Sequence, residues 1–323
     1  MNELRYANAV ARIRANELSL VSKQSMEQVM RSKDITSALK ALADKGYAGI
    51  AETENYETVL KARLDDAWQL LNEVLPEKNI LDFLVVKNDF HNIKNALKCI
   101  IAGRNPQRHY MTPSVIPPKA IDEAVKTRNY SELPKFAANT IAEVYEVLSR
   151  TQNGQEADII TDRRSLEYML EIADKTGESM IIDIAQKLCA LTDIKIALRG
   201  TRTKKDRLFF SMAIAKCSAF DKQKLINSAL TGENALKEYL MQTDYREATE
   251  HIENSNLAFE KWCDDLIMKT VEIAKSKVFG VEPLIAYYIA KEAEVKNIRI
   301  MLSCINNGIS AEETEERMRL LYV

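Results

Sequence analysis

The chain is poor in the residues that break helices and build tight turns. Only 9 glycines and 7 prolines occur among its 323 residues. Together they make up about 5 % of the chain, where ordinary usage is roughly 12 %. Large β-sandwiches and doubly wound sheets need glycine in many turns, and Rossmann or P-loop sites need glycines in a fixed row. The sequence therefore predicts an all-α fold without a glycine-built nucleotide site.

Composition and net charge exclude some classes of binding partner. Hydrophobic residues are 46 % of the chain, enough for a sizeable core, and the net charge of −2 provides no overall field that would attract nucleic acid. The amino-terminal residues lack the apolar region of a signal peptide. The longest apolar stretches, 208–215 and 283–290, are too short for a membrane span. We therefore expect a chain that neither crosses a membrane nor binds nucleic acid.

Potential metal ligands are scattered along the sequence. The three histidines, His91, His109 and His251, form no H-E-x-x-H pattern. The cysteines form no C-x-x-C pair, which is typical of reduced thiols in the cytosol, and we expect them to act as buried small hydrophobes. The sequence thus predicts no metal site and no cofactor. The cysteines are Cys99, Cys189, Cys217, Cys263 and Cys304.

A short pattern recurs three times with a period of about 100 residues. It reads Asn-Ile-Lys-Asn-Ala-Leu at 92–97, Asp-Ile-Lys-Ile-Ala-Leu at 193–198 and Asn-Ile-Arg-Ile-Met-Leu at 297–302. Apolar residues at spacings of three and four surround each copy, which predicts a long core helix. Gly103 and Gly308 follow the first and third copies where a left-handed helix cap is expected, and Lys204 stands at that place in the second.

Weaker similarity precedes each long helix. A pair of short helices is predicted at 26–30 and 35–43, at 118–125 and from 130 onward, and at 225–230 and 235–240. A helix with an aromatic residue (Trp68, Tyr168 or Trp262) follows each pair. These repeats predict a threefold-like body with units at 1–110, 111–205 and 206–323. The predicted capping residues are Ser25 with Gln28, Asp34, Asn129 with Glu132, and Ser310 with Glu313.

Polar residues recur at fixed places on the three long helices. A repeated polar position among apolar neighbours fits either a repeated structural hydrogen bond or a repeated contact face for a partner, and the sequence leaves both open. An acidic residue stands three positions before the first and third copies, and alanine replaces it in the second. The candidate residues are Asp89, Asn92, Lys94, Asp193, Lys195, Glu294, Asn297 and Arg299.

No pattern indicates a catalytic residue. The pairs Asp65-Asp66 and Asp264-Asp265 lack the third aspartate of a magnesium-binding D-D-x-x-D motif. We interpret them as solvated acids in the first turn of a helix. A small-molecule enzyme of the all-helical kind is therefore disfavoured. A basic cluster at 199–207 fits either a site for phosphate or an acidic partner, or an ordinary helix end and exposed loop.

Three stretches of the sequence resemble one family. Residues 282–299, followed by Asn307-Gly308 and the terminal Leu-Tyr-Val, resemble the C subunit of prokaryotic V-type and A-type ATPases, whose eukaryotic counterpart is the d subunit. The opening Tyr-Ala-Asn-Ala-Val-Ala-Arg-Ile-Arg at 6–14 and Asp-Phe-His-Asn-Ile-Lys at 89–94 are similar to motifs of the same family. The resemblance covers essentially the whole chain and is weakest in the middle repeat.

The resemblance implies a fold and a role. The family's subunit is a funnel of three similar helical units around a pseudo-threefold axis, without catalytic activity or cofactor. It binds the proteolipid rotor ring at the cytoplasmic face of the membrane and the foot of the central axle, within a hetero-oligomeric rotary ATPase that transports H⁺ or Na⁺. We expect alanine at Asn92 and Asn297 to weaken binding to the ring or the axle. The alternative is a freestanding all-α scaffold or adapter.

Overall fold

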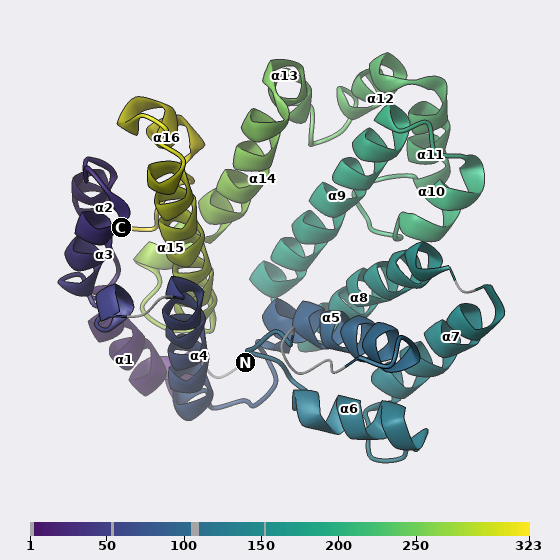
Figure 1. The fold of residues 1–323 in the computed structure, drawn as a ribbon, viewed down its shortest axis with the longest axis horizontal. Coiled ribbons are helices and arrows are strands. Elements are labelled where there is room, and N and C mark those ends of the chain that lie inside the picture. Colours follow the sequence, from purple (N-terminus) through teal and green to yellow (C-terminus); the bar gives the residue numbers. More distant parts are fainter. Residues whose placement is uncertain (1–2, 53–54, 105–109, 152) are drawn as a thin grey trace. The chain divides into compact units, whose positions relative to one another are not determined.

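The computed structural model describes residues 3–52, 55–104, 110–151 and 153–323, and His109 lies outside this set. Within these ranges the chain forms sixteen α-helices and no strand, which confirms the predicted all-α class (Figure 1). None of the described helices combines the length and the apolar character that a membrane span requires. The helices group into two compact units, residues 79–249 and residues 1–78 with 250–323.

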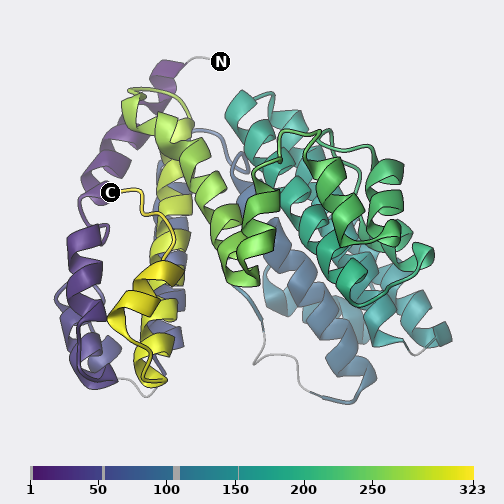
Figure 2. The same cartoon turned by 90° about the horizontal axis from the view of Figure 1, so that it is seen from above.

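The unit built from both chain ends surrounds helix α15 (Glu282–Asn306). Val295, Ile298 and Leu302 on this helix pack against apolar residues of three helices near the amino terminus. Figures 1 and 2 show the carboxy-terminal residues beside α2. The other helices of this unit are α1 (Ala7–Glu17), α2 (Lys23–Met30), α3 (Ile35–Ala43), α4 (Tyr56–Val74), α14 (Asn256–Val271) and α16 (Ala311–Arg317), and α13 (Ala248–Asn254) begins at the unit boundary. Short 3-10 helices occupy Glu3–Tyr6, Ile50–Glu52 and Glu272–Ser276.

The second unit contains the other two long helices, α5 (Asp82–Ile101) and α9 (Ser179–Arg202). Ile93 and Leu97 on α5 pack against Ile121 and Ile141 from the two helices that follow. The remaining helices are α6 (Pro118–Thr127), α7 (Lys135–Thr151), α8 (Gly154–Thr176), α10 (Arg207–Ala213), α11 (Lys222–Thr231) and α12 (Glu233–Leu240).

Each long helix packs on helices of the next sequence repeat. Helix α5 contacts α6, α7 and α8, and α9 contacts α11 and α12. Helix α15, the last of the three, contacts α2, α3 and α4 near the start of the chain. The sequence period instead places each long helix after its short pair. The limits 1–110, 111–205 and 206–323 therefore describe a repeat in sequence, and as domain limits they stay a prediction.

The predicted helix starts are confirmed in part. Asp34 and Ser310 accept hydrogen bonds from the N–H groups of Ser37 and Glu313, and Pro118 opens α6. Two starts are wrong. Helix α2 begins at Lys23, because Ser22 has extended backbone and its hydroxyl accepts from the N–H of Ser25. Helix α7 begins at Lys135, after Pro134, because proline lacks the N–H that a longer helix would need at that position.

The three long helices end in the same way. Gly103, Lys204 and Gly308 have φ of 65°, 54° and 66°, the left-handed conformation expected of a helix cap. In each case the next residue's N–H donates to a carbonyl five positions back, at 2.7, 2.9 and 3.0 Å. The two glycine caps are confirmed, and the middle repeat has the same cap with a lysine in it.

Replacing Lys204 with glycine should stabilise the protein by about 0.5–1 kcal/mol. A side chain in the left-handed region costs roughly 1–2 kcal/mol, part of which is offset by the greater freedom of glycine in the unfolded chain. Lys204 is exposed, so little packing is lost. Urea unfolding followed by circular dichroism measures the change. The reciprocal variant, Gly308→Lys, should lose a similar amount, and an unchanged midpoint in both variants would contradict the argument.

Candidate functional site

The acidic residues and asparagines among the repeated polar candidates lie on the buried faces of the long helices. Asp89, Asn92, Asp193, Glu294 and Asn297 are all at most 1 % exposed. Each binds the backbone of a segment that leads into or follows a neighbouring short helix. We call the polar residues that hold such a segment against a long helix a clamp. The first clamp lies on α5, the second on α9 and the third on α15.

The first clamp consists of Asn88, Asp89 and Asn92. The Asn92 amide donates to the Met111 carbonyl at 2.9 Å and accepts from the Met111 N–H at 2.8 Å. The Asp89 carboxylate accepts from the N–H groups of Val115 and Ile116, at 3.2 and 2.8 Å. Asn88 donates to the carbonyl of Pro113 at 2.7 Å. These bonds fix residues 111–116, which lead into α6, along α5.

The third clamp consists of Glu294 and Asn297 and repeats this geometry with two separate segments. Asn297 makes the same two-way pair with the backbone of Arg319, at 3.0 and 2.8 Å. Glu294 accepts from the N–H of Val21 at 2.5 Å. Val21 precedes α2 as Ile116 precedes α6. In the third clamp the backbone partners therefore come from both ends of the chain, whereas in the first clamp they all come from residues 111–116.

Glu294 also accepts two buried side-chain donors. The Tyr47 hydroxyl lies 2.6 Å from Oε1, and the Lys291 ammonium lies at the same distance from that oxygen. The side chains of Lys291 and Glu294 are only 3 % and 1 % exposed. Burial, together with the Glu294 charge, raises the pKa of Tyr47 far above its usual value. Glu294 is thus the centre of a buried network that joins α15 to the amino-terminal region.

The acidic pair Asp264-Asp265 fixes the carboxy-terminal residues. Asp264 accepts from Arg319 Nε at 2.8 Å and from Lys296 Nζ at 2.5 Å, while Asp265 accepts from the Leu320 N–H at 2.7 Å. Burial alone would raise the pKa of Asp264, but the two cations hold it below its usual value.

Asp66 is exposed as predicted, but the interpretation of both acidic pairs as first-turn residues is wrong. Asp264 and Asp265 lie in the middle of α14, and Asp65 and Asp66 lie in the middle of α4. In α14 the acids bind the segment that follows α16, and the sequence could not show that this segment folds back onto them.

The second clamp consists of Gln186, Cys189 and Asp193 and differs from the others. Asp193 accepts from the Ala215 N–H at 3.0 Å but has no side-chain N–H to donate. Gln186 accepts from the N–H and the hydroxyl of Ser218, both at 2.9 Å. Alanine replaces the acid found in the other clamps.

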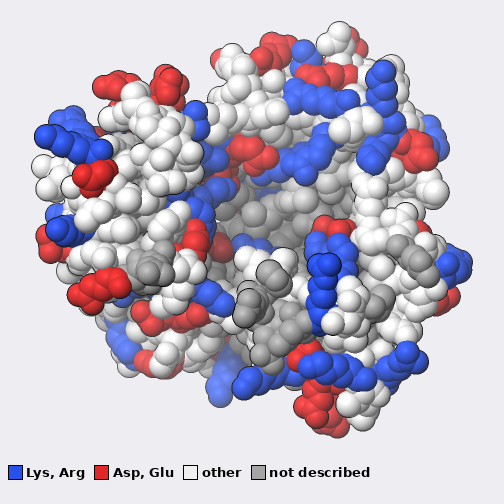
Figure 3. All heavy atoms as spheres, viewed as in Figure 1, with Lys and Arg blue, Asp and Glu red and all other residues white. Residues whose placement is uncertain are grey.

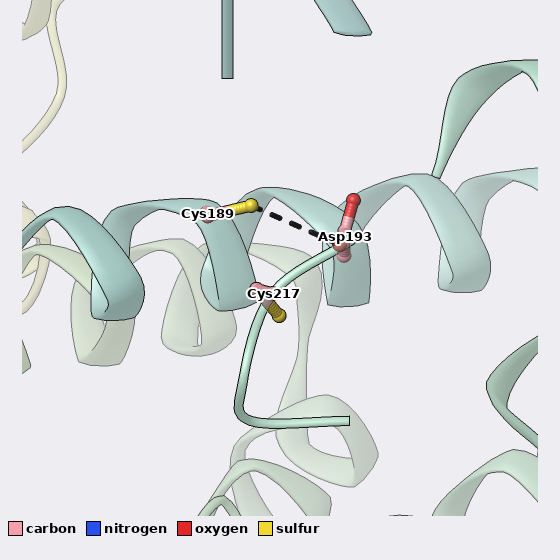
Figure 4. Close-up of side chains that lie close together, drawn as sticks. All are labelled: Cys189, Asp193 and Cys217. Atoms are coloured by element: carbon pink, nitrogen blue, oxygen red, sulfur yellow. Dashed lines mark hydrogen bonds between the residues drawn. The ribbon is translucent and has the colours of Figure 1, made fainter. Parts of the chain in front are cut away.

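A second cysteine joins this clamp from the opposing segment. Cys189 occupies the place of Asn88 on its helix, and Cys217 occupies the place of Pro113, so the fold brings the two thiols together beside Asp193 (Figure 4). Burial raises the pKa of Asp193 to about 8. The Cys189 thiol and three backbone N–H groups lower the pKa of Cys217 to about 6, although burial opposes the shift. No local motif indicates this group, because the cysteines are far apart along the chain.

The basic candidates lie at the edges of the clamps. Lys94 pairs with Asp162 of α8 at 2.7 Å, and Arg299 forms a two-pronged pair with Glu57 of α4 at 2.8 Å. Lys195 is half-buried on α9. Because the two ion pairs are partly exposed, each contributes little to stability. They join α5 and α15 to neighbouring helices.

The basic cluster at 199–207 is partly neutralised within the chain. Arg202 pairs with Glu233, and Arg207 donates to the side-chain carbonyl of Asn227. Over the face drawn in Figure 3, basic and acidic side chains are interspersed. This distribution agrees with the small net charge.

Asp89 should make stability depend on pH. Burial raises its pKa to about 7, although two N–H groups oppose the shift. The folded state therefore retains this proton more strongly than the unfolded chain does. The contribution is complete below pH ~4 and is lost as the pH rises through ~7, at about 1.4 kcal/mol per unit of pKa difference.

Asp89→Asn removes this titration. Urea unfolding between pH 4 and 8 should show a steeper loss of stability with rising pH in the original chain than in the variant, with a difference of a few kcal/mol at most, from about 1.4 kcal/mol per pKa unit. Ser131→Ala, at an exposed position of the same unit, changes no titratable group and should leave the pH dependence as it is. Parallel curves for the original chain and Asp89→Asn would contradict the assignment.

Comparison with known proteins gives one consistent result. A family model described as ATP synthase (C/AC39) subunit matches residues 9–317, which include all three clamp helices. The C subunit of the V-type sodium ATPase of Enterococcus hirae is 29 % identical, over 96 % of this chain and 97 % of the relative. The C subunit of the A-type ATP synthase of Methanocaldococcus jannaschii is 25 % identical, over 95 % and 84 %, and that of Pyrococcus abyssi is 22 % identical, over 96 % and 89 %.

Proposed function

This chain belongs to the ATP synthase (C/AC39) subunit family, and from that membership we propose that it joins the central axle of a rotary ATPase to the membrane ring of proteolipid subunits. It is a non-catalytic subunit of a V-type or A-type ATPase complex. In the proposed role, ATP hydrolysis in the catalytic head turns axle, chain and ring together and drives H⁺ or Na⁺ across the membrane. During synthesis, torque passes in the opposite direction. The chain would lie peripherally at the cytoplasmic face of that membrane.

The family match over nearly the whole chain carries this proposal. The clamps add physical support, because a joint transmits torque only if its parts remain fixed under load. In the first and third clamps, buried and part-buried hydrogen bonds attach the connecting segments to a long helix, and water competes little for the buried ones. Such attachments favour a stiff coupler over a flexible adapter.

Binding to both proposed partners tests the role. The immobilised full chain is incubated with detergent-solubilised proteolipid ring and, separately, with purified axle subunits from the same source. We expect both to be retained in stoichiometric amounts and an unrelated detergent-solubilised membrane protein to pass through. Retention of neither partner would favour the freestanding scaffold, and retention of only one would contradict the coupling role. Helicity and stability cannot separate these alternatives.

A further inference from the structure

Three potential metal ligands meet at the second clamp. Cys189 and Asp193 lie one turn apart on α9, and Cys217 lies on the segment that α9 holds, between α10 and α11 (Figure 4). Their ligand atoms all lie within 4.8 Å of one another, and all three residues are buried. The Cys189 thiol donates to Asp193 Oδ2 at 4.0 Å. Within the part of the chain that the structure describes, this is the one group with such an arrangement.

We propose that Cys189, Asp193 and Cys217 form a binding site for a thiophilic divalent cation, and that Zn²⁺ fits it best. Zinc takes thiolate sulfur at about 2.3 Å and carboxylate oxygen at about 2.0–2.2 Å in tetrahedral geometry, so its ligand atoms lie roughly 3.5–3.8 Å apart. The observed separations need only a small closure to reach that arrangement. The carboxylate favours Zn²⁺ over Cu⁺, which prefers soft ligands alone.

Comparison of the clamps shows which interactions the site would replace. In the first clamp, Asn92 uses both ends of its amide, whereas Asp193 binds the segment through Oδ1 and directs Oδ2 toward the thiols. The hydrogen bond from Asn88 to Pro113 has its counterpart in the pair Cys189 and Cys217. A cation bound to two residues of α9 and one of the segment would restore the attachment that these substitutions remove.

The surroundings suit a charged site. The N–H groups of Ala219 and Phe220 donate to the Cys217 sulfur, as backbone groups commonly do around metal thiolates. Two thiolates and a carboxylate bring three negative charges, of which Zn²⁺ neutralises two. The Lys222 ammonium, fixed by the Ile214 carbonyl at 2.6 Å, interacts with Asp193 and offsets the third. Binding would release to solvent the protons that the two thiols and the Asp193 carboxyl still hold, and a solvent molecule would be the fourth ligand.

Zinc titration of the full chain tests the site. The protein is freed of metal with a chelator, kept reduced with a phosphine, and titrated with Zn²⁺ against a chromophoric chelator. We expect one Zn²⁺ per chain, and Co²⁺ as a probe should give thiolate-to-cobalt charge-transfer absorption. Cys217→Ser should weaken Zn²⁺ binding by about 100-fold, the upper end of what even supporting residues contribute.

Asp193→Asn gives the sharpest comparison. Asparagine recreates the pair that the first and third clamps use, so this variant should fold at least as stably, while Zn²⁺ binding falls by about tenfold or more. Cys304→Ser changes an equally buried thiol outside the site and should leave binding unchanged. Stoichiometric binding that survives both Asp193→Asn and Cys217→Ser would overturn the proposal. So would an absence of bound cation in the reduced chain.

Discussion

Glu294→Ala should lower the free energy of unfolding by about 3–5 kcal/mol, because it leaves a buried cation without its partner. Lys291 is almost fully enclosed, and its ammonium lies 2.6 Å from the Glu294 carboxylate. The N–H of Val21 and the hydroxyl of Tyr47 lose the same acceptor. Unsatisfied donors in a buried place add to the cost. Urea unfolding followed by far-ultraviolet circular dichroism measures the difference.

Two further variants show where the cost arises. Arg299→Ala, on the same helix, removes an ion pair whose side chains are almost half exposed, and should cost less than about 1 kcal/mol. Lys291→Met added to Glu294→Ala should recover part of the loss, because the stranded charge is gone, while the Val21 and Tyr47 donors remain without an acceptor. A loss from Glu294→Ala no larger than that from Arg299→Ala would contradict the buried network.

Local patterns predict much of this fold. The three long helices follow from apolar residues at spacings of three and four, and the caps at Gly103 and Gly308 follow from the position of glycine after each stripe. Both signals depend on neighbours within one or two turns. A similar local signal misplaces the start of α2, because Ser22 and Ser25 are equally good capping residues in sequence and only the path of the preceding chain selects Ser22.

The clamps show what local patterns leave out. Repetition identifies Asn92 and Asn297 as unusual polar residues, but not the backbone groups to which they bind. The third clamp joins residues from opposite ends of the chain, Val21 and Arg319, to one helix. The repeat interval relates Ile116 to Val21 and Pro113 to Cys217, so the sequence repeat could have identified both positions. The meeting of Cys217 with Cys189 depends on the fold, since no spacing rule links two cysteines so far apart.

Asn92→Ala combined with Asn297→Ala should destabilise the protein by about 2–4 kcal/mol per site, because each change leaves one N–H and one carbonyl of a held segment without a partner. Asn92→Ala frees the backbone of Met111, while Asp89 still holds residues 115 and 116, and Asn297→Ala frees the backbone of Arg319 from α15. Urea unfolding gives the energies. Limited proteolysis should show earlier cleavage at the carboxy terminus in Asn297→Ala and near residue 111 in Asn92→Ala.

The same double variant tests whether the clamps matter for the proposed role. Below its unfolding midpoint it should keep its helicity but bind ring or axle about tenfold more weakly, since ordering the released segments would then oppose binding by roughly 1.4 kcal/mol. Lys94→Ala with Arg299→Ala, at the exposed edges of the same helices, leaves the clamps intact and separates loss of surface charge from loss of attachment. Unchanged binding to both partners would show that the clamps affect only the stability of the chain. An unchanged free energy of unfolding would contradict a structural role for the two asparagines.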